Sequence, residues 1–302
     1  MSYCIYEVDR EKKIATITFN RPEKLNAAVT ADWNEVKQRV IETEEDDNIK
    51  VLIFKGAGRC FGTGHDVADL GPHHGWGGPE DPHPSQRRRM KFDKHVFWGK
   101  DGLAQRVLTC DKATIAQVHG YCYGGHHELA IACDITIAAD DSTFTHPGYR
   151  YIGPLGEIVM FFHTIGVKKT KELMLTGTPL DAMTALQCGL VNKVVPLEKL
   201  AEETMKIAET ITRQPADAIF MGKAFLELAQ DISGIGAGYT AGYITHTLQT
   251  NIHYEPGEFN LFREKARKGV KGALVEREAA YKGAPLARSG SSNLTLSHLK
   301  KS

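Results

Sequence analysis

Hydrophobic and polar positions divide the first sixty residues into three elements. The alternation and the β-branched residues of Tyr3–Phe19 predict a β-hairpin. Ala31–Glu45 has the spacing of an amphipathic helix, with Thr30 as its expected N-cap. Val51–Gly56 is a short apolar run, which predicts a buried strand. The amino-terminal region is therefore expected to alternate strands with a helix.

Short strands and helices continue toward the carboxyl end. Two more strands are predicted at Thr114–Val118 and Asp134–Ala139, with a helix containing Glu128–Cys133 between them. This alternation indicates an α/β core. The segments beyond it have helical periodicity only, and the predicted helices are Leu200–Arg213, Ala216–Gln230, Ala241–His253, Glu258–Arg267 and Val275–Lys282. The chain turns polar beyond Gly283, and we expect Ala287–Ser302 to be a tail.

A segment rich in glycine, proline and histidine interrupts this pattern. It covers residues 66–85 and predicts a long loop, because glycine and proline break both helices and strands. A helix is expected to follow from Gln86 to Leu108, with a break near Gly99.

Composition and charge narrow the class of protein. The 302 residues include 37 basic and 37 acidic side chains, so we expect neither a nucleic-acid binder nor a binder of anionic membranes. The hydrophobic content of 42% is ordinary for a soluble protein, and no apolar run approaches the about 20 residues of a membrane span. The amino terminus has no secretion signal and the six cysteines are scattered, so we expect reduced thiols and a cytoplasmic protein.

Candidate chemistry gathers at two glycine-rich segments. A glycine pair, Gly124 and Gly125, opens an apolar helix, and Glu128 lies three residues inside it. Glycines let the backbone approach a ligand closely, while the N–H groups of a first helical turn favour negative charge. The second segment, Cys60–Asp66, follows the strand Val51–Gly56. Two backbone donors from separate loops, beside a carboxylate, would suit proton transfer next to a carbonyl group.

Several motifs occur in an order typical of one family. They are Ile14–Ala27, Val51–Gly56, Phe61–Asp66, Ala113–Gly120, Gly124–Gly125, Cys133–Ala138, Leu175–Gly177 and Ala185–Asn192. On these motifs the chain resembles the crotonase superfamily, also called the enoyl-CoA hydratase/isomerase family. The resemblance implies a crotonase-type spiral of ββα units with a C-terminal helical oligomerisation region. It divides the chain into a core at residues 1–225, a helical region at 226–286 and the polar tail at 287–302.

The resemblance also assigns roles to individual residues. It implies that the backbone N–H groups of His65 and Gly125 form an oxyanion hole for a thioester carbonyl, and that Glu128 is a general acid/base. The substrate-binding positions that it implies are Lys24, Ala27, Asp66, His146, Tyr149 and Tyr151. The first two match the segment that holds the adenine end of coenzyme A, and the two tyrosines lie where the acyl group would be bound.

One position departs from the hydratase pattern. Hydratases of the family carry a second glutamate directly after a proline, whereas this chain has Gly148 after Pro147, as in the dihydroxynaphthoyl-CoA synthase branch. Glu157 is a candidate replacement, because dienoyl-CoA isomerases and C–C bond hydrolases of the family place an acid near this position. The alternative is that Glu157 only begins a helix. The departure argues against hydration by two glutamates.

The expected function is catalysis on an acyl-CoA thioester through a stabilised enolate. One alternative is a crotonase-type hydrolase that cleaves a C–C bond of a β-diketone or a cyclic β-keto acyl-CoA. Another is a crotonase-like scaffold that binds a partner without catalysis. No metal site is predicted, and the only cofactor is the coenzyme A of the substrate. The expected partners are the substrate and other copies of the chain, as a homotrimer or a dimer of trimers, with no nucleic acid and no membrane.

Overall fold

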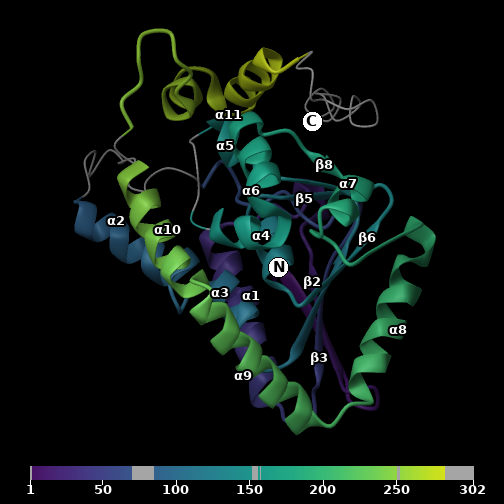
Figure 1. Cartoon of the computed structure of the whole chain (residues 1–302). Helices are drawn as coiled ribbons and strands as arrows, with labels where there is room; N and C mark the ends of the chain where they lie inside the picture. The colour runs from purple at the N-terminus through teal and green to yellow at the C-terminus, as the bar shows by residue number, and fades with distance from the viewer. Residues whose placement is uncertain (1, 70–84, 152–155, 157, 250–251, 283–302) are drawn as a thin grey trace.

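The larger of two β-sheets forms the centre of the protein (Figure 1). The computed structural model describes residues 2–69, 85–151, 156, 158–249 and 252–282. The first two strands form the predicted hairpin, and each later strand of the sheet is parallel to its neighbour. The six strands, in their order across the sheet, are β1 (Cys4–Asp9), β2 (Ile14–Phe19), β3 (Val51–Gly56), β4 (Ala113–Val118), β6 (Ile135–Ala139) and β9 (Lys193–Val195).

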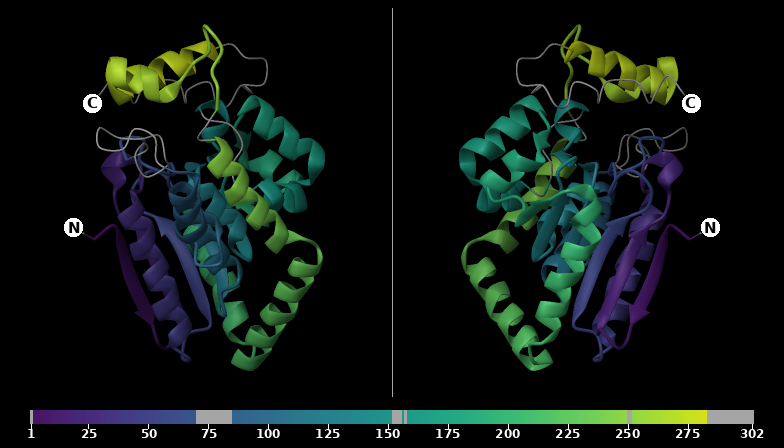
Figure 2. Two further views of the ribbon diagram at one scale, coloured as in Figure 1. Left: turned by 90° about the vertical axis from the view of Figure 1, so that its left-hand side faces the viewer. Right: turned by 90° about the vertical axis from the view of Figure 1, so that its right-hand side faces the viewer.

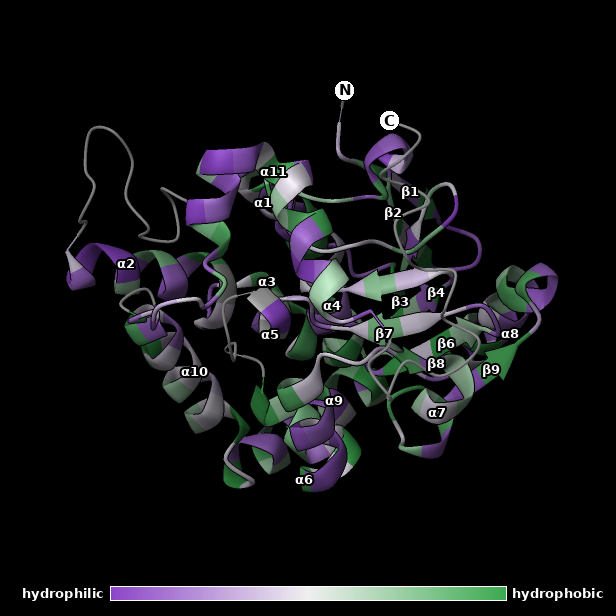
Figure 3. Ribbon diagram, turned by 90° about the horizontal axis from the view of Figure 1, so that it is seen from above, coloured by the Kyte–Doolittle hydropathy of each residue, from purple (hydrophilic) through white to green (hydrophobic). Residues whose placement is uncertain are grey.

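Side chains of these strands build an apolar core on each face of the large sheet. Val51 and Ile115 belong to one core, which is closed by helix α8 (Leu200–Thr212). Their chain neighbours Leu52 and Ala116 belong to the core on the opposite face, because successive side chains of a strand alternate. In Figure 3 the central strands are largely green, and purple, hydrophilic residues gather on outer helices such as α2 (Gln86–Phe92). Burial on both faces explains why these strands are continuous apolar runs in the sequence.

The chain alternates between the large sheet and a smaller one. The small sheet consists of β5 (Tyr121–Tyr123), β7 (Thr143–Thr145) and β8 (Leu180–Asp181). The chain runs from β4 to β5 and into helix α4 (Gly125–Ala132), and then from β6 to β7 and into further helices. A bridge between Gly62 and Cys122 adds the segment after β3 to the same layer. The predicted spiral of ββα units is confirmed.

Helices surround the two sheets (Figure 2). Helix α1 (Thr30–Glu45) contributes its apolar side chains to the core opposite α8. The other helical elements are η1 (Pro22–Lys24), η3 (Asp93–Trp98), α3 (Leu103–Leu108), α5 (Gly148–Tyr151), α6 (Ile158–Thr176), α7 (Ala182–Gln187), η4 (Leu197–Lys199), α9 (Ala216–Ile232), α10 (Ile235–Gln249) and α11 (Leu261–Ala280). The predicted break near Gly99 is confirmed, because η3 ends at Trp98 and α3 begins beyond it.

Two predicted helix boundaries were wrong. Thr30 is the first residue of α1 rather than its N-cap; the cap is Val29, whose N–H donates to the Asp32 carboxylate. The predicted helix Ala241–His253 is α10, which begins six residues earlier, at Ile235. Glycines disguised this start in the sequence, since glycine disfavours isolated helices.

Glycines in α10 have a packing role. A Cβ on Gly238 would lie 2.3 Å from the Val159 side chain, and a Cβ on Gly242 would lie 2.2 Å from the Gly156 carbonyl oxygen. These glycines allow α10 to approach the segment at the start of α6. The last two predicted helices form one element, α11, which is interrupted only at Gly269, where φ is +71°.

Two adjacent histidines in α4 are buried completely. His126 and His127 have no exposed surface, and burial lowers the pKa of each to about 3. His127 packs against Phe144 and Phe161. Its ring nitrogens make no hydrogen bond of standard geometry within the described chain, although the Thr145 backbone contact favours the charged ring weakly. Both imidazoles are therefore neutral in the folded protein.

We predict that acid destabilises the protein through these histidines. Below pH about 6.5 the unfolded chain protonates both rings, whereas the folded protein does so only near pH 3, so the free energy of unfolding falls as the pH falls. The loss is about 1.4 kcal/mol per pH unit for each histidine. His127→Phe should remove the contribution of one histidine. Between pH 7.5 and 5.0 the free energy of unfolding of the variant should therefore fall about 2 kcal/mol less than that of the wild type. Urea unfolding at the two pH values measures this difference.

The matched control is His163→Phe, because His163 is exposed on α6. This variant should keep the acid sensitivity of the wild type. Equal pH dependence of His127→Phe and the wild type would show that His127 is not the source of the effect.

Candidate active site

Glu128, on α4, is held by two nitrogen atoms from different parts of the chain. The residue is 8% exposed. His146 Nε2 lies 3.0 Å from Glu128 Oε1, and the indole N–H of Trp98 donates to Oε2 over 3.2 Å. His146 follows β7, whereas Trp98 is the last residue of η3. Contacts to both oxygens fix the orientation of the carboxylate.

The segments after β3 and β5 bring His65 and Gly125 close together. The bridge between Gly62 and Cys122 aligns the two segments. A Cβ on Gly64 would lie 3.0 Å from the backbone nitrogen of Gly125, and Gly64 has a φ of +87°, which favours glycine. His65 follows directly, so its backbone lies beside the start of α4. The Gly125 N–H has no partner within its helix, because it belongs to the first turn.

A buried chain of hydrogen bonds holds the segment that contains His65. The backbone N–H of Gly64 donates to His126 Nδ1 over 2.9 Å. His126 Nε2 lies 3.0 Å from the Tyr3 hydroxyl, which donates to the Asn26 carbonyl over 2.6 Å. Burial raises the pKa of Tyr3 well above its usual value, so the phenol keeps its proton. Neutral His126 therefore accepts from Gly64 and donates to Tyr3, which fixes its tautomer.

The side chain of His65 is held on the α1 side of the site. Trp33 Nε1 donates to His65 Nδ1 over 3.2 Å, and His65 Nε2 lies 3.3 Å from Asp69 Oδ2. Burial lowers the pKa of His65, even though the Asp69 carboxylate opposes the shift. The Thr30 N–H and hydroxyl also donate to Asp69. These contacts occupy the imidazole, so the backbone is the part of His65 that can serve as an oxyanion donor.

Asn26 connects the first loop to the loop after β3. Its backbone has a φ of +56°, and the residue is fully buried. Its amide nitrogen contacts three carbonyl oxygens, those of Ala57, Cys60 and Phe61, at 2.9 to 3.3 Å. Its Oδ1 accepts the Arg21 N–H. The side chain thus replaces regular pairing where both loops leave the sheet.

The predicted coenzyme A positions lie on this first loop. Ala28 bridges to His65, which places Ala27 next to the oxyanion segment. Lys24 is exposed. The Asp66 carboxylate accepts the Ala68 N–H over 3.0 Å and lies 3.2 Å from the guanidinium of Arg21, so its described partners belong to the loops themselves.

The structure groups four of the predicted site residues. His146, His65 and Gly125 lie within three residues of a small-sheet pairing position, Glu128 lies on the helix that Gly125 begins, and the loops touch. Three predicted positions stay untested by these contacts. The backbones of Tyr149 and Tyr151 belong to α5, but their side chains are not described, and Glu157 lies outside the described residues.

Sequence patterns missed Trp98 and His126. Trp98 follows the His/Gly/Pro-rich segment at a distance of 30 residues from Glu128, and no motif points to it. His126 lies two residues before Glu128 in the glycine-led helix, and the motif assigns it no role. The available signal was its position within an apolar helix, because an imidazole buried there needs polar partners.

Metal ligation finds no support within the described ranges. No group of three or more His, Cys, Asp or Glu side chains in them could hold an ion. Nor does any helix of the described chain combine the length and apolar composition of a membrane span.

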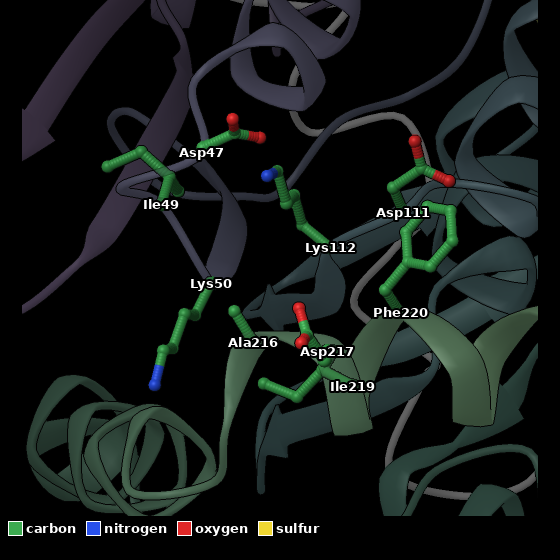
Figure 4. Close-up of a pocket in the computed structure, with 9 residues that line it drawn as sticks. All are labelled: Asp47, Ile49, Lys50, Asp111, Lys112, Ala216, Asp217, Ile219 and Phe220. Carbon is green, nitrogen blue, oxygen red and sulfur yellow. The ribbon is translucent and has the colours of Figure 1, made fainter.

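A separate pocket of about 340 Å³ lies at the opposite end of the large sheet (Figure 4). It is lined by residues that precede β3 and β4, including Lys50 and Lys112, and by the start of α9. Figure 4 shows acidic side chains, Asp47, Asp111 and Asp217, around the same space. None of the predicted site residues lines this pocket.

The geometry around Glu128 suits chemistry beside a carbonyl group. Two strand exits present backbone N–H groups on one side, and an oriented carboxylate lies at the fourth position of the adjoining helix. Backbone donors of this kind stabilise an oxyanion, and a buried carboxylate can transfer a proton to or from an adjacent carbon.

Comparisons with known proteins agree with this geometry. Residues 9–235 match the family model described as enoyl-CoA hydratase/isomerase. The chain is 32% identical to a probable enoyl-CoA hydratase of Mycobacterium bovis over 235 residues, which cover 77% of this chain and 85% of the relative. It is 29% identical to a probable mitochondrial enoyl-CoA hydratase of Dictyostelium discoideum, over 91% of this chain and 89% of the relative.

A solved structure shows the same fold. The crystal structure of an enoyl-CoA hydratase/isomerase from Xanthobacter autotrophicus Py2 superimposes with a TM-score of 0.79 at 27% identity, covering 92% of this chain and 98% of the other. Family model, relatives and fold coincide, and the chain belongs to the enoyl-CoA hydratase/isomerase family, the crotonase superfamily.

Proposed function

We propose that the protein is an enzyme that acts on an unsaturated acyl-CoA thioester through an enolate. The observation that carries this proposal is the close approach of the Gly64–His65 backbone to that of Gly125, at the start of the helix that carries Glu128. The two N–H groups bind the thioester oxygen, whose negative charge grows as the enolate forms. Each such donor contributes about 10²–10³ in rate in enzymes of known mechanism.

Glu128 performs the proton transfers of this reaction. In hydration, its carboxylate takes a proton from water as the water oxygen bonds to the β-carbon, and the electron pair of the double bond moves to the enolate. The enolate then collapses as Glu128 returns the proton to the α-carbon. One carboxylate is thus enough for both proton transfers, which agrees with the presence of Gly148 where hydratases carry a second glutamate.

The remaining substrate contacts follow from the position of the loops. Lys24 and Ala27 lie on the loop that bridges to the oxyanion segment, where the adenine end of coenzyme A would bind. Asp66 shapes this loop through its ion pair with Arg21. Tyr149 and Tyr151 border the acyl group. The proposed reaction uses no cofactor other than the coenzyme A that is part of the substrate.

A second candidate is cleavage of a C–C bond in a β-diketone or a cyclic β-keto acyl-CoA. Gly148 favours this candidate, because the second hydratase acid is missing there. The same oxyanion hole would hold the enolate that leaves when water attacks the other carbonyl carbon. Glu157 would then be the residue that activates water.

We predict that Glu128→Gln abolishes turnover. Glutamine keeps the shape of the side chain but cannot accept a proton, so kcat should fall about 10²–10⁴-fold. Mass spectrometry of the wild type with crotonyl-CoA and a panel of cyclic and aromatic acyl-CoAs should show the gain of one water with an intact carbon skeleton. Run in deuterium oxide, the same assay detects isomerisation as label uptake without water gain.

The control is Glu209→Gln, since the Glu209 side chain on α8 is 42% exposed and its carboxylate pairs only with Lys12 among its described contacts. It should retain full activity. If the products have gained water and their C–C bond is cleaved, and if Glu157→Gln fails to form them, the reaction is C–C bond hydrolysis and not hydration. If the wild type converts none of the thioesters or diketones, the proposal that the protein is an enzyme is contradicted, and a binding scaffold is favoured.

We further propose that α9 packs against other copies of the chain in a trimer or a dimer of trimers. None of its 17 residues is buried in the described chain. Figure 1 shows α9 at the lower edge of the molecule, followed by α10. The exposed large apolar side chains of α9 are Phe220, Met221, Phe225, Leu226, Leu228 and Ile232. Six exposed large apolar side chains on one helix are typical of a protein–protein interface.

We predict that Phe225→Asp separates the subunits, because Phe225 is 70% exposed in the single chain and a buried carboxylate would be unpaired at an interface. Light scattering after gel filtration should show a threefold or sixfold mass for the wild type and a lower mass for the variant. Leu197→Asp makes the same change at an exposed leucine outside α9 and should leave the mass unchanged. A wild type that elutes as a monomer would contradict the proposal.

A further inference from the structure

His146 lies two residues before the position at which hydratases of the family carry a second glutamate. Gly148 leaves no side chain at the usual position. Two residues earlier, His146 is the first residue after β7, whose pairing with β5 sets Thr145 opposite Tyr123. The Gly124 N–H donates to the Thr145 carbonyl, and a Cβ on Gly124 would lie 3.9 Å from His146 Nε2. The spiral itself therefore brings this imidazole to the entrance of α4.

Backbone geometry defines which nitrogen of His146 carries the proton. The Gly148 N–H donates to Nδ1 over 3.1 Å, so Nδ1 is an acceptor. The neutral ring then has its proton on Nε2, which lies 3.0 Å from Glu128 Oε1. An imidazolium would direct a second N–H against that of Gly148. His146 is thus a neutral donor to the carboxylate.

Trp98 secures the other carboxylate oxygen from the opposite direction. Its N–H donates to Oε2, and the centroid of its indole ring lies 4.3 Å from that of the His246 ring on α10, with the two rings tilted by 51°. A Cβ on Gly156 would lie 2.6 Å from the indole, so the ring is enclosed on this side as well. His246 Nδ1 lies 3.1 Å from Asp93 Oδ2, which also accepts the Thr247 hydroxyl. Both donors to Glu128 are therefore supported by residues behind them.

We propose that His146 is a positioning residue that replaces the missing second acid by fixing Glu128 as the sole acid/base. Its Nε2–H stays on the ring throughout the cycle, because Nδ1 is occupied by Gly148 and cannot take up a proton from the other side. Each oxygen of Glu128 keeps one lone pair for the substrate or water proton. This inference rests on the proposed function, and it adds that one oriented carboxylate carries every proton transfer.

The test compares His146→Leu with His146→Gln on a thioester that the wild type converts. Leucine removes the donor, so kcat should fall about 10²-fold, the size of effect that misplacement of a catalytic group produces, while KM changes less than about threefold. Glutamine can present an amide N–H near Oε1 and should restore kcat to within about tenfold of the wild type. His163→Leu, at an exposed histidine of α6, should have wild-type kcat.

A double mutant separates positioning from an independent role. Because His146 acts through Glu128, His146→Leu should change kcat less than about threefold in a Glu128→Gln background. A loss of about 10²-fold in that background, or full activity of His146→Leu alone, would overturn the proposal.

A measurement on the wild type keeps the proposal testable if the variants fail to fold. Nitrogen-15 NMR of labelled histidines should show the proton of His146 on Nε2, the nitrogen that faces Glu128, rather than on Nδ1. A proton on Nδ1, or an imidazolium, would overturn the proposal whatever the activity. Conversely, a Glu128→Gln variant with wild-type activity would contradict the proposed function and leave the NMR result for His146 unaffected.

Discussion

Parallel pairing in the small sheet is the constraint on which the site depends. Each turn of the spiral must return to this sheet at one register position, and Gly62, Cys122 and Phe144 occupy it in three successive turns. The next few residues of every turn emerge at the same edge, so His65, Gly125 and His146 become neighbours although 80 residues lie between the first and the last. Close contact between the turns requires glycine: a Cβ on Gly120 would lie 2.4 Å from the Arg59 carbonyl oxygen. The site is therefore a consequence of strand register rather than of loop flexibility.

Register alone would leave the loops loose, and buried polar groups tighten them. Gly64 cannot pair regularly at its positive φ, and His126 accepts its N–H instead. An imidazole can do so only while it is neutral, which complete burial ensures. The same burial lowers the free energy of unfolding in acid, since the unfolded chain binds a proton that the folded chain does not bind. Order at the oxyanion loop and sensitivity to acid thus have one cause.

Local patterns predicted the parts of this arrangement that local chemistry determines. The hairpin, the strand Val51–Gly56 and the glycine-led helix of Glu128 each follow from residues adjacent in sequence. Tertiary partners decided the rest. The glycines of α10 have a low helix propensity, but they allow contact with Gly156 and Val159 from a distant segment. Likewise, His126 and His127 are indistinguishable in the motif, and only the fold gives one a hydrogen-bond chain and the other an aromatic cage.

Contacts from the C-terminal helices reach the site although its chemical groups precede them in the chain. His246 of α10 packs against the indole that donates to Glu128, and Lys265 of α11 donates to the Val67 carbonyl just beyond the oxyanion segment. Both supports act on positioning elements rather than on the reacting atoms. Helix α9, which exposes apolar side chains, leads directly into the helix behind Trp98. The orientation of the Glu128 carboxylate thus depends on a C-terminal helix as well as on the core, at a site where Gly148 stands in place of a second acid.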